Sequence, residues 1–374
     1  MYSQQELDDA VASGVITANA ANALRAHVES QRRTAIPDEE QFRLITGFND
    51  IFVAIAAAIL LFAVGWIGQS IGQSTGMIIT DGDKFGPSFL GPLFVTATAW
   101  GLALFFTARR RMALPSILLL LAFVGGVLTT TGFLLVQIIG PDRFDNNTSQ
   151  LLPAVVGGVS AAVAAVGAWL HWRRFHVPIT VAAGAAAVAG IFLAAVVAIV
   201  QPNDSQSAYN LILSFVLLLG IGVFLFAMWW DSSDRARLTR RSDVAFWLHL
   251  LAAPMIAHPI FTLMGLNRGT VSAGEALAVV GLYILFGLTA LAVDRRALLV
   301  SALAYVLYAL TELFKQFGAV ELNVALTALV IGSALLMLSA YWHQARRLVV
   351  SRLPSGLQDR LPNLDRPALT QQAA

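Results

Sequence analysis

Long hydrophobic stretches separated by short polar turns dominate the sequence from residue 48 to residue 343. The apolar segments fall at 48–69, 89–108, 113–138, 152–171, 177–200, 208–230, 244–265, 272–293, 297–316 and 320–343. A helical segment of about 20 residues spans the hydrocarbon core of a bilayer, which is roughly 30 Å thick. The pattern therefore predicts an all-α fold, a polytopic transmembrane helical bundle of about ten helices.

The basic residues between these segments fall almost entirely on one side of the predicted membrane. Of the 24 Lys and Arg residues, all but Lys84, Arg143, Arg268 and Lys315 lie before the first segment, after the last one, or in alternate turns. Short basic turns stay on the cytoplasmic side of a membrane. We therefore expect a multi-pass protein of the bacterial inner membrane with both termini in the cytoplasm.

Composition agrees with a membrane location and excludes several classes of chemistry. Hydrophobic residues make up 57% of the chain and charged residues 12%, about half of the roughly 25% charged residues usual in soluble domains. The absence of cysteine excludes disulfides and thiolate ligands or nucleophiles. No catalytic or nucleotide-binding motif is present. We therefore predict no enzyme activity, no cofactor, no metal site and no nucleic-acid partner.

The chain divides into three predicted regions. Residues 1–46 form a cytoplasmic helical hairpin and a juxtamembrane segment, in which Gly14 ends one helix and Thr17 caps the next. Residues 47–345 form the ten-helix domain, and residues 346–374 form a disordered cytoplasmic tail. Short helices are marginally stable alone in water, so the hairpin either packs on the membrane domain or docks on a cytoplasmic protein partner.

The seventh hydrophobic segment is the most unusual because it contains two prolines. Pro254 and Pro259 each lack a backbone donor, which frees the carbonyl groups of Leu250 and Met255. A kinked helix with exposed acceptors is expected there.

Two histidines lie in the same segment. His258 is 14 residues beyond Val244, about 21 Å along a helix, which makes it the ionisable residue predicted to lie deepest in the bilayer. Such residues bind polar substrates, relay protons or ligate metals; alternatively, a neutral His258 bonds a carbonyl on a neighbouring helix. His249 lies on the opposite side of the helix, so we predict no metal site with two histidines.

Further candidates for an intramembrane polar site lie in other segments. Glu312 and Lys315 are three residues apart and can pair on one helix face, either closing a helical hairpin or forming the mouth of an outward-facing cavity. Asp50 suits the amino end of the first helix. Thr130, within the run 129–131, either lines a polar cavity or bonds the carbonyls of its own helix.

Small residues recur at helical spacing in several segments. Gly65, Gly68 and Gly72 lie in the first segment, and Gly157 and Ala161 lie in the fourth. Faces of this kind let membrane helices approach closely, so we expect tight packing at these positions.

Three stretches together resemble a family of uncharacterised bacterial inner-membrane proteins. They are Gly14-Val-Ile-Thr17, Gly47-Phe-Asn-Asp-Ile-Phe52, and Phe246-Trp-Leu-His-Leu-Leu-Ala-Ala-Pro254 followed by His258-Pro259. The resemblance implies an amino-terminal cytoplasmic helical hairpin and a bacterial inner membrane. It implies no substrate and no catalytic residue.

Two function classes remain open from the sequence. The first is a transporter or permease for a small solute, with a cavity lined by helices one, three, seven and nine; the shortage of intramembrane charge favours a neutral substrate. The second is a non-transporting scaffold or sensor that presents residues 1–46 to a cytoplasmic protein partner.

Overall fold

A computed structural model describes residues 10–24, 48–79, 86–144, 149–202, 205–235, 237, 239–265, 272–316 and 322–364. The chain forms two units, residues 1–43 with 365–374, and residues 44–364. In the first unit, residues 10–12 and 18–24 are helical. Gly14 has a positive φ of 75°, and the Thr17 hydroxyl accepts a hydrogen bond from Ala20 N at 3.2 Å. Gly14 and Thr17 thus have the conformation and the capping bond that the sequence predicts, and the rest of residues 1–46 lies outside the described residues.

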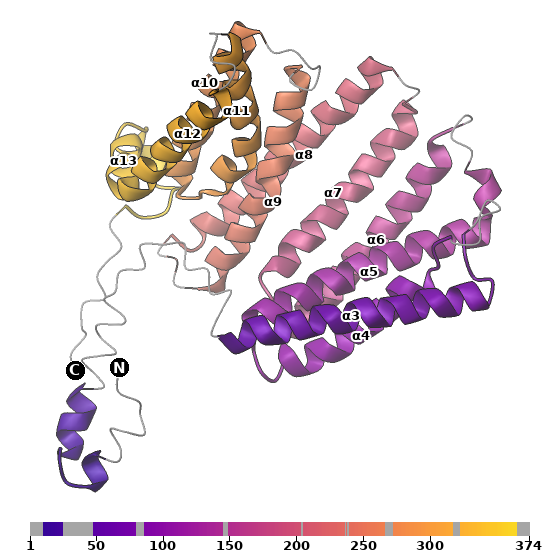
Figure 1. The fold of residues 1–374 in the computed structure, drawn as a ribbon, viewed down its shortest axis with the longest axis horizontal. Helices are drawn as coiled ribbons and strands as arrows, with labels where there is room; N and C mark the ends of the chain where they lie inside the picture. The colour runs from indigo at the N-terminus through magenta and orange to yellow at the C-terminus, as the bar shows by residue number, and fades with distance from the viewer. Residues whose placement is uncertain are drawn as a thin grey trace. The chain divides into compact units, whose positions relative to one another are not determined.

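The second unit consists of helices (Figure 1). They are α3 (Phe48–Ser74), α4 (Leu90–Phe106), α5 (Ala113–Ile139), η1 (Pro141–Arg143), α6 (Leu151–Phe175), α7 (Ile179–Val200), α8 (Gln206–Ser232), α9 (Arg240–Leu263), α10 (Ala273–Val293), α11 (Ala297–Gln316), α12 (Asn323–Ala340), α13 (Trp342–Val350) and α14 (Ser355–Gln358). All ten predicted segments are thus helical, and the described residues contain no strand.

Nine helices within the described residues are long and apolar enough to cross a membrane. The one remaining predicted segment, 89–108, forms α4, which is shorter at 17 residues and is at the lower limit of about 17 for a spanning helix. Large apolar side chains such as Phe62 and Trp66 face outward from α3, as the bilayer environment of a membrane protein requires. The chain is therefore a polytopic helical membrane protein.

From α3 to α9 each helix packs beside the next one in the chain, whereas beyond α9 it is α11 that packs on both α9 and α10. We divide the second unit into two halves (Figure 1). The amino-terminal half is α3–α7 and the carboxy-terminal half is α8–α14. Helix α7 contacts both α8 and α9 and joins the halves. We call the ends of the helices that carry the basic turns, such as residues 109–111 and 295–296, the arginine-rich end.

Glycines permit the closest helix contacts in both halves. A Cβ atom on Gly68 of α3 would lie 2.5 Å from the carbonyl oxygen of Leu90. A Cβ atom on Gly220 of α8 would lie 2.9 Å from the main chain of Met255, the residue whose carbonyl is freed by Pro259. The predicted close packing at Gly68 is confirmed.

The structure corrects the predicted tail. The sequence predicts disorder from residue 346, but helix α13 continues to Val350 and the chain remains packed up to residue 364. Trp342, Arg346 and Leu361 are buried. Sequence composition fails here because the segment is ordered by contacts with distant helices, which a polar pattern does not reveal.

Candidate functional site

An apolar groove lies between three helices of the amino-terminal half and has a volume of about 920 Å³. Its lining residues come from α5, α6 and α7, together with Phe144 after η1. They are Leu121, Val124, Gly125, Leu128, Thr129, Gly132, Phe133, Val136, Phe144, Pro153, Ala154, Val156, Gly157, Ser160, Ala161, Ala164, Ala183, Ala186, Ala187, Gly190, Leu193, Ala194 and Val197.

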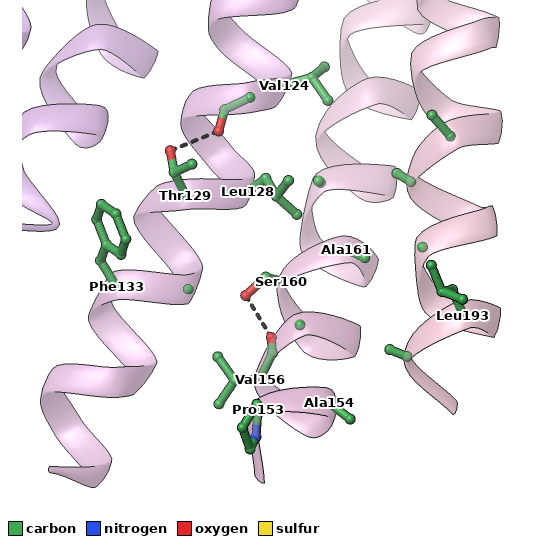
Figure 2. A pocket seen from close by; sticks show the side chains of 18 of the residues that line it. Val124, Leu128, Thr129, Phe133, Pro153, Ala154, Val156, Ser160, Ala161 and Leu193 are labelled. Atoms are coloured by element: carbon green, nitrogen blue, oxygen red, sulfur yellow. Dashed lines mark hydrogen bonds between the residues drawn. The ribbon is translucent and has the colours of Figure 1, made fainter. Parts of the chain in front are cut away.

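Small residues on two of these helices create the hollow. A Cβ atom on Gly158 would lie 3.2 Å from Ala194, and one on Gly190 would lie 3.4 Å from Ala161. Helices α6 and α7 therefore approach closely, as small-residue faces allow. Their short side chains leave unfilled space toward α5, whose lining includes the larger Leu128 and Phe133 (Figure 2).

The two polar side chains of the lining are already satisfied by their own helices. Thr129 Oγ1 donates to the Gly125 carbonyl at 2.8 Å, and Ser160 Oγ donates to the Val156 carbonyl at 2.7 Å (dashed lines in Figure 2). Neither hydroxyl proton is available to a ligand in this arrangement. The groove therefore suits a hydrocarbon group better than a polar solute.

The groove runs along the helices and away from the arginine-rich end. On α5 its lining extends from Leu121 to Val136, which is about 22 Å along the helix. The last lining residue on α5 is only three residues from the end of the helix at Ile139. The last one on α7 is likewise three residues from its end at Val200. The groove therefore reaches the end of the helices opposite the arginine-rich end.

Aromatic rings fill the space between α4, α5 and α6 toward the arginine-rich end. The ring centroids of Trp100 and Phe123 are 5.0 Å apart, and those of His171 and Phe175 are 4.6 Å apart. His171 is fully buried, and its Nδ1 lies 3.3 Å from the Thr180 hydroxyl. Among the described residues, no charged side chain contacts the His171 imidazole.

The structure places His258 in the last third of α9. Helix α9 begins at Arg240 rather than Val244 and ends at Leu263, so His258 lies only about 7.5 Å from its far end. The side chain is exposed, and Nδ1 lies 2.5 Å from the Tyr305 hydroxyl of α11. The sequence offered, as one alternative, a neutral His258 that bonds a carbonyl group on a neighbouring helix. The observed partner of His258 is instead the phenol of Tyr305.

His249 lies in a different environment from His258. It is fully buried, its Nδ1 lies 2.8 Å from the Ala245 carbonyl, and the same atom lies 3.7 Å from Asp231. His249 Nε2 is buried and has no hydrogen-bond partner among the described residues. The two histidines of α9 are not brought together, and the described residues hold no group of three metal-ligand side chains.

A buried ion pair lies beside His249 and joins α8, α9 and the turn between α10 and α11. Asp231 Oδ1 accepts from Arg295 Nη2 at 2.6 Å, and the same guanidinium donates to the Ser242 carbonyl at 3.0 Å. Both charged side chains are almost fully buried. Removing such charges from water is costly unless each is paired and hydrogen-bonded, and this pair meets both conditions.

A second ionic group lies at the same end and includes α13. Asp294, which follows α10, accepts from Arg237 at 2.8 Å and from Trp342 Nε1 at 2.8 Å. The Arg346 guanidinium lies 3.7 Å from the same carboxylate. Together with Asp231 and Arg295, these side chains define what we call the ionic cluster: Asp231, Arg237, Asp294, Arg295 and Arg346.

The remaining predicted candidates lie apart from one another. Glu312 and Lys315 form a partly exposed pair at 2.6 Å, as their spacing predicts. Asp50 is buried in the first turn of α3. Thr130 has a buried hydroxyl without a hydrogen-bond partner in the part of the chain that is described. The structure therefore does not assemble the predicted candidates into one site.

Sequence reasoning missed the ionic cluster. Its arginines belong to the basic turns that indicate orientation, and its aspartates lie at the ends of segments, where polar residues are common. The available signal was an acidic residue directly after Trp229-Trp230 and another directly before Arg295-Arg296. Pairing them requires knowing that residues 231 and 295 meet across 64 positions.

Comparison with known proteins adds no assignment to this geometry. No family model, no curated protein and no solved structure matches the chain.

Proposed function

We propose that this protein binds and carries a lipid-like molecule, taking its hydrocarbon chain into the groove between α5, α6 and α7. The apolar groove is the observation that supports the proposal. Its volume of about 920 Å³ is near the upper end of the roughly 300–1,000 Å³ usual for ligand pockets. Lipid tails are as apolar as leucine side chains, and this lining matches them.

The position of the groove favours a lipid of one leaflet. The groove is about 22 Å long along α5. One leaflet is roughly 15 Å thick, which is half of a 30 Å hydrocarbon core, so the groove is long enough to hold the whole acyl chain of a lipid in one leaflet. The groove reaches the helix ends opposite the arginine-rich end. With the arginine-rich end in the cytoplasm, as the positive-inside rule predicts, the bound chain belongs to the outer leaflet.

A small neutral solute is a less suitable cargo. The sequence predicts a cavity lined by helices one, three, seven and nine, whereas the groove is lined by α5, α6 and α7, the third, fourth and fifth of the predicted helices. Its two hydroxyl groups donate to their own helices. A solute that needs hydrogen bonds would lose its water without gaining partners.

A filling experiment tests the proposal. Gly125 and Gly157 line the groove, and an added Cβ atom at either position meets open space. The double variant Gly125→Leu/Gly157→Leu should reduce by at least twofold the radiolabelled phosphatidylcholine that remains bound to the protein after detergent washing. The bulky side chains occupy the volume that the acyl chain would take.

The matched control places the same substitutions outside the groove. Gly101 and Gly222 are helical glycines that also face open space, and Gly101→Leu/Gly222→Leu should retain as much lipid as the wild type. Equal retention by all three proteins would contradict the proposal.

The orientation needs its own measurement. Ser207 and Ser232 are exposed near opposite ends of α8, and the native chain has no cysteine. In intact cells, a membrane-impermeant maleimide should label Ser207→Cys and leave Ser232→Cys unlabelled. The opposite result would place the groove in the inner leaflet.

A scaffold role for residues 1–46 is the alternative function. It is favoured by the division of the chain, which separates residues 1–43 from the membrane bundle. Deleting residues 1–40 should leave lipid retention unchanged if the bundle acts as a carrier. Loss of a cellular phenotype in the deletion, with lipid retention intact, would support the scaffold instead.

A further inference from the structure

The segment after α12 folds back onto the arginine-rich end of the carboxy-terminal half. Trp342, Arg346 and Val350 of α13 are four residues apart, share one helix face and are buried. After α13 the chain passes through an exposed stretch, 354–357, and then becomes buried again at Leu361 and Pro362. Two separate parts of this segment are therefore anchored.

Two arginines hold the second part through its main chain. Arg235 donates from Nε to the Leu361 carbonyl at 2.9 Å and from Nη2 to the Gln358 carbonyl at 3.2 Å. Arg346 donates from Nη2 to the Pro362 carbonyl at 2.7 Å and from Nη1 to the Asn363 carbonyl at 3.2 Å. The Asn363 amide in turn donates to the Arg235 carbonyl at 3.3 Å.

One side chain of this part enters an apolar contact. Leu361 is buried with Val293 at the end of α10 and Val350 at the end of α13, and Phe224 and Met228 of α8 pack against them. Gln358 ends α14 and residues 359–360 form a turn, so the segment is held as a turn by arginine side chains that donate to its carbonyl groups and by the burial of Leu361. The bonds give affinity, and the side chain fixes the register.

We propose that Arg235, Arg346, Val293 and Val350 form a peptide-docking surface, and that residues 358–363 of the same chain occupy it reversibly. We expect residues 358–363 to detach locally without unfolding of the bundle. Few side chains of this segment are buried, and residues 354–357 before it are exposed. Local opening is easiest where apolar burial is small.

Docking of this segment shields the ionic cluster from water. Arg346 binds the segment and also lies 3.7 Å from Asp294. Val293, which contacts Leu361, directly precedes Asp294 in the sequence. Release of the segment exposes the Arg346 guanidinium and hydrates the neighbouring carboxylate. The segment is therefore a strap that controls access to the charged end of the carboxy-terminal half.

A binding experiment in two parts tests docking. A chain truncated after Arg352 should bind a fluorescein-labelled peptide of residues 353–364 saturably in a fluorescence anisotropy titration. The full-length chain should bind the same peptide at least tenfold more weakly, because its own segment occupies the surface. Arg235→Met in the truncated chain and Leu361→Ala in the peptide should each weaken binding at least tenfold.

Arg240→Met is the matched control for loss of a positive charge. Arg240 is exposed at the start of α9 and forms no hydrogen bond or ion pair with the described residues of the segment, so the truncated variant should bind as the parent does. Docking is refuted if the folded truncated chain fails to bind the peptide. It is also refuted if Arg235→Met and Arg240→Met bind equally well.

Cysteine labelling of the full-length chain tests release without truncation. The thiol introduced by Leu361→Cys should react with a maleimide more slowly than that of Leu357→Cys, which is exposed. It should react at least tenfold faster than that of Ala302→Cys, which is fully buried in α11. A rate as slow as that of Ala302→Cys would show that the segment does not leave.

Discussion

The two halves of the membrane bundle each bury a histidine, and the surroundings of the two side chains differ. In the amino-terminal half, His171 lies among aromatic rings with the Thr180 hydroxyl at 3.3 Å. In the carboxy-terminal half, His249 lies 3.7 Å from Asp231, which is paired with Arg295. The buried histidine of the first half has a neutral hydroxyl beside it, whereas that of the second half lies beside a buried ion pair.

This difference teaches how each half is held together. In a bilayer, helices associate by close packing of small residues and by hydrogen bonds rather than by expulsion of water. The amino-terminal half relies mainly on close packing of small residues, and the hydroxyl groups of its groove, those of Thr129 and Ser160, bond their own helices. The carboxy-terminal half joins α8, α9 and the α10–α11 turn through charges, whose burial makes the contacts specific and sensitive to loss of one partner.

The largest expected effect comes from breaking the buried ion pair. Asp231→Ala leaves the Arg295 guanidinium buried without its carboxylate and should lower the free energy of unfolding by about 3–5 kcal/mol. Denaturation by sodium dodecyl sulfate in mixed micelles measures the change. A double replacement, Asp231→Leu with Arg295→Met, should recover most of the loss; no recovery would show that packing, not charge, causes it.

A smaller effect is expected from overpacking the amino-terminal half. Gly68→Ala places a Cβ atom 2.5 Å from the Leu90 carbonyl oxygen and should cost about 1–3 kcal/mol of unfolding free energy. The control is Gly101→Ala, where an added Cβ atom meets nothing within 4 Å. If both variants unfold alike in the same denaturation assay, the close α3–α4 contact does not stabilise this half.

An exposed ion pair should matter much less than the buried one. Glu312→Gln removes the carboxylate 2.6 Å from Lys315, in a pair whose side chains are 21% and 43% exposed, and should cost no more than about 1 kcal/mol. The same unfolding measurement in high and low salt checks this. If Glu312→Gln lowered the free energy of unfolding as much as Asp231→Ala does, burial would not explain why the two ion pairs differ in strength.

The smallest effect is expected at a hydroxyl that bonds its own helix. Ser160→Ala removes the bond to the Val156 carbonyl of the same helix, and the free energy of unfolding should change by less than about 0.6 kcal/mol, the mean value for hydrogen bonds between membrane helices. Lipid retention should also persist, because the groove becomes slightly more apolar. A marked loss of bound lipid would show that the Ser160 hydroxyl contacts the ligand.

The helices could be predicted closely because each one is specified by its own hydrophobic run. The predicted segment 113–138 corresponds to α5, Ala113–Ile139. Errors occur at the ends, as in α9, where Thr239 accepts a hydrogen bond from Arg241 N and starts the helix before the apolar residues. Hydropathy reports the length of chain inside the hydrocarbon, whereas a helix continues wherever its backbone is capped.

The site could be predicted much less well. The Glu312–Lys315 pair follows from helical spacing, but the contact of His258 with Tyr305 spans 47 positions and that of Arg295 with Asp231 spans 64. The groove has no marker at all in the sequence, because alanine and glycine occur equally at tight helix contacts. Whether small residues close a gap or leave one depends on the third helix.

The sequence by itself determined that this chain is a helical membrane protein, where its helices lie, and which ends carry the positive charge. These properties follow from local hydrophobicity and bilayer thickness, which act on one segment at a time. Only the tertiary structure decided that α5–α7 leave an apolar groove, that Asp231 and Arg295 meet, and that residues 358–363 dock on Arg235 and Arg346. Each of these features depends on how helices that are far apart in the sequence pack together, and the pattern along the sequence does not specify that packing.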